Sequence, residues 1–164
     1  MKLKEAMDKY GDYEVKEDEL KKILEKPKPK TVWDLKKGDV YWYINTNGDV
    51  IESDWIEGIS DTEAREMGNI FLTEQDAEFE RERRKIEAIM LKYGRRMFSH
   101  DCSNYMIRMS EKHAEIMIPN CLYYSYGVIY FDTTELARKA VEEIGTEKFR
   151  KYYFRAEKQK NNTN

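Results

Sequence analysis

An Asn-Gly pair between two short runs of alternating residues is the feature that most constrains this sequence. The pair is Asn47-Gly48, and the stretch around it reads VYWYINTNGDVIESDW over residues 40–55. Asn-Gly readily takes positive φ at both positions, as a two-residue type I′ turn requires. The sequence therefore predicts a β-hairpin in which Asn47-Gly48 forms the loop and Ile44 pairs with Ile51.

This register would divide the hairpin into two faces, because side chains alternate across a strand with a period of two. One face would be apolar and form core, and it collects Val40, Trp42, Ile44, Ile51 and Trp55. The other would be exposed to water and combines tyrosines with carboxylates, namely Tyr41, Tyr43, Glu52 and Asp54. A slip of one residue would bury the acids instead. Since a two-stranded hairpin is not stable alone, other parts of the chain must cover its apolar face.

Length and composition limit the class of protein. The 164 residues suffice for one domain or two small ones. Twelve tyrosines and three tryptophans argue against disorder, and a formal net charge of −3 argues against general nucleic-acid binding. No apolar run approaches the roughly 20 residues of a membrane span, and the N-terminus lacks the apolar core of a signal peptide. Two cysteines predict no disulfide framework, so we expect a cytoplasmic protein in a reducing compartment.

Four segments are expected along the chain. Residues 1–30 should form a short helical segment that ends in the linker KPKPK, because alternating prolines favour an extended chain. Residues 31–94 and 95–158 should form two modules, and residues 159–164 a disordered tail.

The two modules contain related stretches. Residues 68–77 read GNIFLTEQDA and residues 127–137 read GVIYFDTTELA. In each, an aromatic strand end runs into a capped helix, and Thr73 should cap a helix that continues to about Tyr93. The predicted fold class is therefore α+β, with two tandem β-hairpin–strand–helix modules, antiparallel sheets and a short helical N-terminal segment.

Several stretches together resemble a family of small proteins from phages and prophages of Firmicutes. They are KEAMDKYGDYEV, KPKPKTVWDLKKGDVYWYI, GNIFLTEQDAEFERERRK and GVIYFDTTELARKAVEEIGTEKFRKYYF. The resemblance covers most of the chain except residues 95–121. It implies a genomic setting rather than an activity. In that setting, a small acidic accessory protein is expected to inhibit a host system.

A run of acidic residues from Asp39 to Glu66 is the first candidate functional feature. It contains eight acids against a single base, Arg65. Such a surface would attract a basic site on a partner protein and compete with nucleic acid for it. The alternative is that these charges only solvate an exposed strand. The predicted partner-binding residues are Tyr41, Tyr43, Asp49, Glu52, Asp54 and Glu57, in which the tyrosines would act as interface anchors.

A second candidate is nucleic-acid binding through a basic helix and an aromatic sheet. The bases are Arg81, Arg83, Arg84, Lys85, Lys92, Arg95 and Arg96. Glutamates interleaved at distances of three and four residues favour a salt-bridged surface helix instead. The aromatic residues of the C-terminal half are expected to form core rather than to stack on bases. They are Tyr123, Tyr124, Tyr126, Tyr130, Phe131, Phe149, Tyr152, Tyr153 and Phe154.

Metal binding and catalysis have weaker signals. The residue types of a tetrahedral zinc site occur in His100, Cys102, His113 and Cys121, but no Cys-x-x-Cys pair is present. Cys102 beside a histidine has the composition of a nucleophile–base pair, yet no motif orients it and no phosphate-binding loop exists. We therefore predict a non-enzymatic protein, without metal or cofactor, that binds and inhibits a host protein such as a defence nuclease. The sequence leaves its oligomeric state open.

Overall fold

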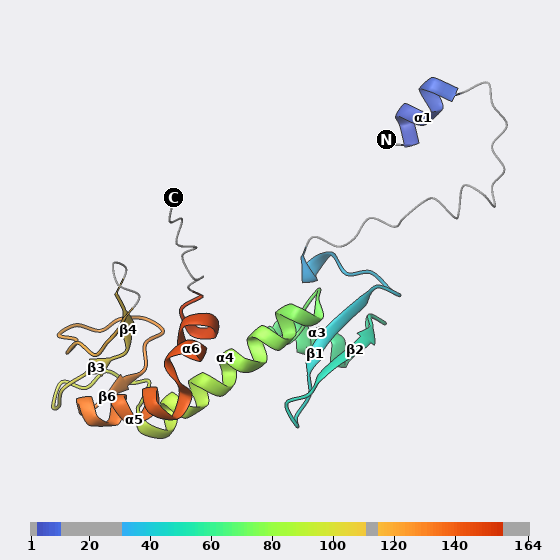
Figure 1. Cartoon of the computed structure of the whole chain (residues 1–164). Helices are drawn as coiled ribbons and strands as arrows, with labels where there is room; N and C mark the ends of the chain where they lie inside the picture. The colour runs from blue at the N-terminus through green and yellow to red at the C-terminus, as the bar shows by residue number, and fades with distance from the viewer. Residues whose placement is uncertain (1–2, 11–30, 111–114, 156–164) are drawn as a thin grey trace, which may run out of the picture.

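The computed structural model describes residues 3–10, 31–110 and 115–155 (Figure 1). The helices are α1 (Leu3–Tyr10), α3 (Ile59–Glu66), α4 (Glu74–Tyr93), α5 (Thr134–Ile144) and α6 (Thr146–Lys148), with a 3-10 turn η1 (Val32–Asp34) and a π turn η2 (Phe149–Tyr153). The strands are β1 (Val40–Ile44), β2 (Val50–Asp54), β3 (Tyr105–Met106), β4 (Arg108–Met109), β5 (Ile116–Met117) and β6 (Tyr130–Phe131). The predicted Lys-Pro linker and the predicted tail at 159–164 lie outside the described residues.

The strands form small antiparallel sheets, and the fold is α+β as predicted. The described sheets have two strands each, with the pairs β1–β2, β3–β6 and β4–β5. Strands β3 and β4 are separated by Ile107 alone, and the chain passes there from one sheet to another. Ile107 is buried at this point, so the interruption places an apolar side chain in the core.

Helix α4 links the two halves of the molecule. Its 20 residues correspond to about 30 Å of helix. Figure 1 shows the β1–β2 hairpin and α3 at one end of α4, and α5, α6 and the short strands at the other. The helix contacts both hairpin strands as well as α5 and η2. Surfaces on the two halves are therefore held apart by this helix.

The start and the end of α4 follow from local sequence. The hydroxyl oxygen of Thr73 accepts a hydrogen bond from the Asp76 backbone N–H at 3.1 Å, which caps the helix. The helix ends before Gly94, as predicted, although this glycine is extended rather than left-handed. A Cβ atom at Gly94 would lie 2.6 Å from the carbonyl oxygen of Tyr130. The glycine thus permits β6 to pack directly against the end of α4.

The related strand–helix stretches are also alike in structure. Thr133 caps α5 as Thr73 caps α4, and both residues have an extended backbone with φ near −137° and −136°. Before the caps, Phe71 forms an antiparallel bridge with Trp42 of β1, and β6 pairs antiparallel with β3. The predicted order of hairpin, strand and capped helix occurs in the second half, whereas in the first half α3 follows the hairpin and the strand is reduced to the bridge at Phe71.

The hairpin loop differs from the predicted two-residue turn. It contains three residues, 46–48, and a backbone hydrogen bond of 2.9 Å from Asn45 N–H to the Asp49 carbonyl closes it. Of these, Gly48 has a positive φ of 85°. The side-chain oxygen of Asn45 accepts bonds from the N–H groups of Asn47 and Asp49, which stabilises the longer loop. That local side-chain contact competes with the type I′ turn and favours the longer loop.

The longer loop shifts the register by one residue and exchanges the faces of β1 only, because Glu52 and Asp54 of β2 stay exposed on the outer face. Tyr41 lies opposite Ser53, and Tyr43 opposite Ile51. Tyr41 is only 5% exposed and packs with Trp55, so the tyrosine face covers the core. The predictions that Tyr41 and Tyr43 face water and that Trp42 belongs to the core face are therefore wrong, whereas Trp55 is buried as predicted. This is the outcome expected when pairing slips by one position.

Each half has its own buried cluster. The first is small and contains Leu35, Tyr41, Trp55 and Ile70. The second is larger and contains Ile86, Met90, Ile107, Ile129, Phe131, Ala137, Ala140, Ile144 and Phe149. In the part of the chain that the structure describes, no helix is long and apolar enough to cross a membrane.

Candidate functional site

The outer face of the hairpin carries exposed carboxylates beside apolar side chains. Glu52 lies opposite Trp42, and Asp54 opposite Val40, so each acid shares a face with an apolar neighbour. Both acids are exposed, Trp42 is half-buried and Val40 is 47% exposed. We call these four residues the acidic face. The predicted acids are present on this surface, but they are accompanied by Trp42 and Val40 instead of the two tyrosines.

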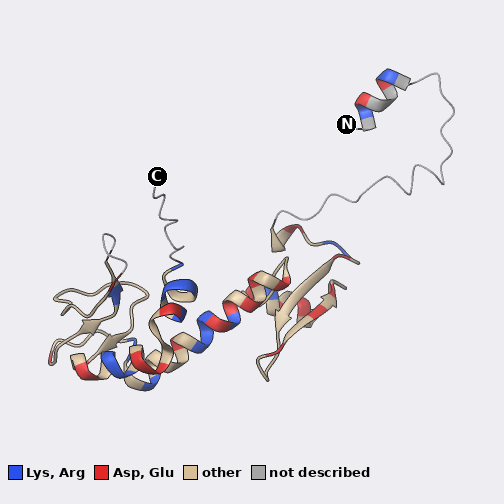
Figure 2. Cartoon of the chain, viewed as in Figure 1, with Lys and Arg blue, Asp and Glu red and all other residues tan. Residues whose placement is uncertain are grey.

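Two further predicted residues lie at the ends of the hairpin strands. Asp49 is exposed in the loop, where one carboxylate oxygen accepts a 3.2 Å hydrogen bond from the Asn45 amide. Glu57 is exposed just after β2 and has a φ of 61°, a left-handed conformation uncommon for a residue other than glycine. Figure 2 shows acidic positions on β2 and in the adjoining segments. The acids therefore extend along the hairpin rather than gathering at one point.

The carboxylates of the acidic face form no ion pair within the described parts of the chain. Among the described residues, neither Glu52 nor Asp54 takes part in an ion pair or a side-chain hydrogen bond. Residues 31–72 contain nine acids and three bases. One of the bases, Arg65, is held over the rings of Trp33 and Trp55, at 4.7 and 4.6 Å from their centroids. The negative charge of this surface is therefore open to solvent or to a partner.

Asp61 is an acid of the same stretch with a structural role. It is 5% exposed, and its carboxylate accepts hydrogen bonds from the Tyr41 hydroxyl at 2.9 Å and from the backbone N–H groups of Ile56 and Gly58 at 2.9 and 3.3 Å. Burial by itself would raise the pKa of Asp61, but these hydrogen bonds outweigh burial and lower the pKa. Burial, and to a smaller extent the hydrogen bond to Asp61, raise the pKa of the Tyr41 hydroxyl. Sequence reasoning missed this pair because its members are twenty positions apart.

The basic residues in the middle of α4 pair with glutamates of the same helix, and Lys92 near its end pairs with Glu143 of α5 at 2.8 Å. Arg83 is bound by Glu80 at 2.7 Å and by Glu87 at 3.3 Å, and Arg84 is bound by Glu80 at 3.0 Å. Arg81 and Lys85 pair with Glu82, and Arg96 pairs with Glu87. Although partial burial opposes the effect, the two arginines lower the pKa of Glu80. The predicted salt-bridged surface helix is confirmed, and this weakens the nucleic-acid interpretation.

A loop in the second half exposes a run of aromatic side chains. In this segment, which we call the tyrosine loop (residues 121–127), Tyr123, Tyr124 and Tyr126 are 80%, 63% and 93% exposed. The buried Tyr130 fixes the loop, since its hydroxyl accepts from the Ser125 N–H at 2.7 Å and donates to the Ser125 carbonyl at 2.9 Å. The prediction that these three tyrosines form core is wrong, whereas Tyr130, Phe131 and Phe149 are buried as expected.

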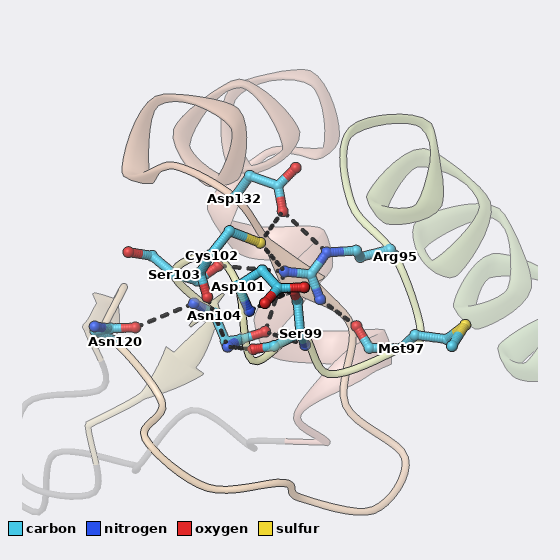
Figure 3. Close-up of polar contacts among 9 residues, drawn as sticks. All are labelled: Arg95, Met97, Ser99, Asp101, Cys102, Ser103, Asn104, Asn120 and Asp132. Atoms are coloured by element: carbon cyan, nitrogen blue, oxygen red, sulfur yellow. Dashed lines mark hydrogen bonds and ion pairs between the residues drawn. The ribbon is translucent and has the colours of Figure 1, made fainter.

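Arg95 is the centre of a polar cluster that holds residues 95–104 against the second half (Figure 3). Its Nε donates to Asp132 at 2.9 Å, Nη1 donates to the Met97 carbonyl, and Nη2 donates to Cys102 Sγ at 3.1 Å and to Asn104 Oδ1 at 3.1 Å. Asn104 is buried, and its amide donates to the Ser99 carbonyl at 2.7 Å. Because each nitrogen of the guanidinium already donates, the cluster fits a structural role better than anion binding.

Of the four residues considered for zinc or catalysis, the structure describes His100, Cys102 and Cys121, and these three form no common metal site. The thiol of Cys102 contacts Arg95 and Asp132, while the ring of His100 packs on Phe98. The thiol of Cys121 contacts the Tyr123 carbonyl. His113 lies outside the described residues. Within them, no group of three His, Cys, Asp or Glu side chains is arranged to hold a metal ion.

Comparison of the chain with family models, with curated proteins and with solved structures gave no match. The function must therefore be argued from the geometry of these surfaces.

Proposed function

We propose that this chain is a non-enzymatic protein-binding module that uses the acidic face to occupy a basic surface on a partner protein. One observation carries the proposal: Glu52 and Asp54 are exposed and have no ion pair with any described residue. A carboxylate that a fold does not pair internally retains its full attraction for a cationic partner. Long-range attraction of this kind accelerates association and favours partners of opposite charge.

The apolar members of the acidic face supply the second requirement of a protein contact. Charges at the rim of an interface change association rates more than affinity, and most binding energy comes from a few buried anchors. Trp42 and Val40 lie on the same face as the acids and are only partly covered. Tryptophan is among the residues most enriched at the energetic centre of interfaces. We therefore assign Trp42 the anchoring role that the sequence had suggested for Tyr41 and Tyr43.

The chemistry of the acidic face favours a nucleic-acid-handling partner. Exposed carboxylates in a row compete for the same lysine and arginine side chains that bind phosphates. The resemblance to phage and prophage proteins supplies the setting, in which the chain would bind and inhibit a host protein such as a defence nuclease. Direct nucleic-acid binding through α4 is the less favoured function, because Arg83 and Arg84 are already paired.

The tyrosine loop supports a second contact surface for the same class of function. Tyrosine gives a large contact area at a low entropy cost, because its side chain has few rotatable bonds. The hydrogen bonds between Ser125 and Tyr130 hold the loop in one conformation, which reduces the cost of ordering it on binding. This loop and the acidic face lie at opposite ends of α4 (Figure 1). Two contacts on the molecule can therefore form independently of each other.

The test compares two charge reversals of equal size. Immobilised chain would be used to capture proteins from a bacterial lysate treated with nuclease, for wild type, Glu52→Lys/Asp54→Lys and Glu78→Lys/Glu142→Lys. The control acids are also exposed and have no ion pair among the described residues, but they lie on α4 and α5. We expect the wild-type chain to capture a partner protein even after nuclease treatment. The Glu52→Lys/Asp54→Lys variant should lose this capture, and the control variant should retain it.

Two results would count against the proposal. Capture that persists with Glu52→Lys/Asp54→Lys would exclude the acidic face as the contact. Capture that disappears with nuclease and with Arg83→Glu/Arg84→Glu would instead assign the chain to nucleic-acid binding.

A further inference from the structure

An apolar pocket of about 310 Å³ opens in the second half of the molecule. It lies between β3–β4, the residues that lead into β6, and η2. Its wall includes Met90, Met106, Met109, Tyr153 and Phe154, with Arg108 as the charged lining residue. The acidic face belongs to the other half of the molecule, so the pocket is separate from it.

The lining suits a flexible apolar group. Three of the wall residues are methionines, whose unbranched and polarisable side chains adapt to irregular shapes. Met90 is fully buried at the base of this region and belongs to the larger core cluster, so part of the wall is fixed by packing. Ligand pockets are typically apolar with a few polar groups that set orientation, and this volume is at the lower end of their range of roughly 300–1,000 Å³. A small ligand fits better than a large cofactor.

Arg108 supplies the polar group. Its side chain is exposed and makes no hydrogen bond or ion pair with any residue that the structure describes. Other arginines of the same half are occupied: Arg95 by Asp132, and Arg138 by Glu135. A guanidinium is planar and binds carboxylates with two parallel hydrogen bonds. An unpaired guanidinium beside an apolar pocket therefore matches a ligand with an anionic head and an apolar body.

We propose that this pocket binds a medium-chain alkyl carboxylate, with the alkyl chain among the methionines and the carboxylate on Arg108. Since one water occupies about 30 Å³ of liquid, the pocket has room for roughly ten groups of that size, which is about the size of octanoate. The head group gains a charge-assisted pair, and the chain gains the burial of its apolar surface. Neither contribution involves the acidic face.

The test separates the two contributions with matched ligands on the full chain. Isothermal titration with octanoate, octan-1-ol and acetate would be combined with NMR of methionine methyl groups labelled with carbon-13. We expect saturable binding of octanoate, with shifts of the Met90, Met106 and Met109 methyl signals. Arg108→Gln should weaken octanoate at least about tenfold and leave octanol unchanged, because only the carboxylate uses the guanidinium. Acetate should not bind, because it lacks the alkyl chain.

Two variants control the result. Arg138→Gln removes a similarly exposed arginine outside the pocket and should leave octanoate affinity unchanged. Val128→Phe should fill the pocket and remove binding of both octanoate and octanol. The proposal is overturned if octanoate shows no saturable binding, or if Arg108→Gln binds octanoate like the wild type. Methyl shifts at methionines outside the pocket, with none at the three lining it, would also overturn it.

Discussion

The acids of the hairpin and the acids of α4 have different surroundings. On α4, Glu80 binds two arginines within hydrogen-bonding distance, whereas Glu52 on the hairpin has no cationic partner among the described residues. The helix places residues three and four positions apart on one face, so interleaved glutamates and arginines meet automatically. A strand brings a residue next to one from another strand, and here Glu52 faces Trp42. The same residue type therefore supports the fold in one region and remains available for a partner in the other.

Asp61 differs from the exposed acids of the hairpin because it is buried and hydrogen-bonded. Its removal should cause the largest loss of stability among these predictions. Asp61→Ala would leave the Tyr41 hydroxyl and two backbone N–H groups without their buried acceptor. We expect the free energy of unfolding to fall by about 2 to 4 kcal/mol, measured by urea denaturation. Asp54→Ala is the matched control and should change it by less than about 0.5 kcal/mol. Equal losses of stability in the two variants would contradict a stabilising role for the hydrogen bonds of Asp61.

The pH dependence of stability should depend on the same residue. The pKa of Asp61 in the folded protein lies below its ordinary value of 3.8. A carboxyl of this kind stabilises the fold fully above the unfolded pKa, and the contribution is lost as the pH falls through the folded pKa. The difference in unfolding free energy between wild type and Asp61→Asn should therefore shrink from about pH 5 to about pH 2. Urea titrations across this range measure it, and a constant difference would contradict the assignment.

Glu80 and Glu52 provide the direct comparison of a paired and an unpaired acid. Glu80→Gln weakens the contacts with Arg83 and Arg84 and should lower the free energy of unfolding by roughly 1 kcal/mol. Glu52→Gln removes no contact and should stay within about 0.5 kcal/mol of wild type. Chemical denaturation of both variants under the same conditions measures the two changes in the free energy of unfolding. A larger loss for Glu52→Gln would mean that the hairpin acid stabilises the fold.

Raising the salt concentration should cause the smallest change among these predictions, a weakening of the Glu80–Arg83 ion pair. The interaction energy between Glu80 and Arg83, measured by a double-mutant cycle, should fall by a few tenths of a kcal/mol between about 0.1 and about 1 M NaCl. The pair is partly exposed, so ions screen it in part. A cycle between Glu52 and Arg83 serves as the reference and should give no interaction energy at either concentration. An interaction energy between Glu80 and Arg83 that does not respond to salt would indicate a contact governed by packing.

The sequence by itself determined the features that depend on near neighbours. Thr73 and Thr133 cap their helices through residues three positions away, and the ion pairs of α4 join residues at most four apart within the helix. The existence of the hairpin was also predictable, since its strands and its loop are contiguous. The caps and ion pairs need no knowledge of the rest of the chain, because their energies come from contacts within one short helical segment.

The tertiary structure decided which side of each element faces the core. The bonds that Asn45 accepts in the loop are local, but the burial of Tyr41 depends on Asp61 of α3, which accepts the tyrosine hydroxyl from twenty positions away. The tyrosine loop is exposed because Tyr130 enters the core and holds it through Ser125. The identity of an apolar or aromatic residue does not by itself determine whether its side chain is buried or exposed. That choice is fixed only when elements far apart in sequence pack against each other.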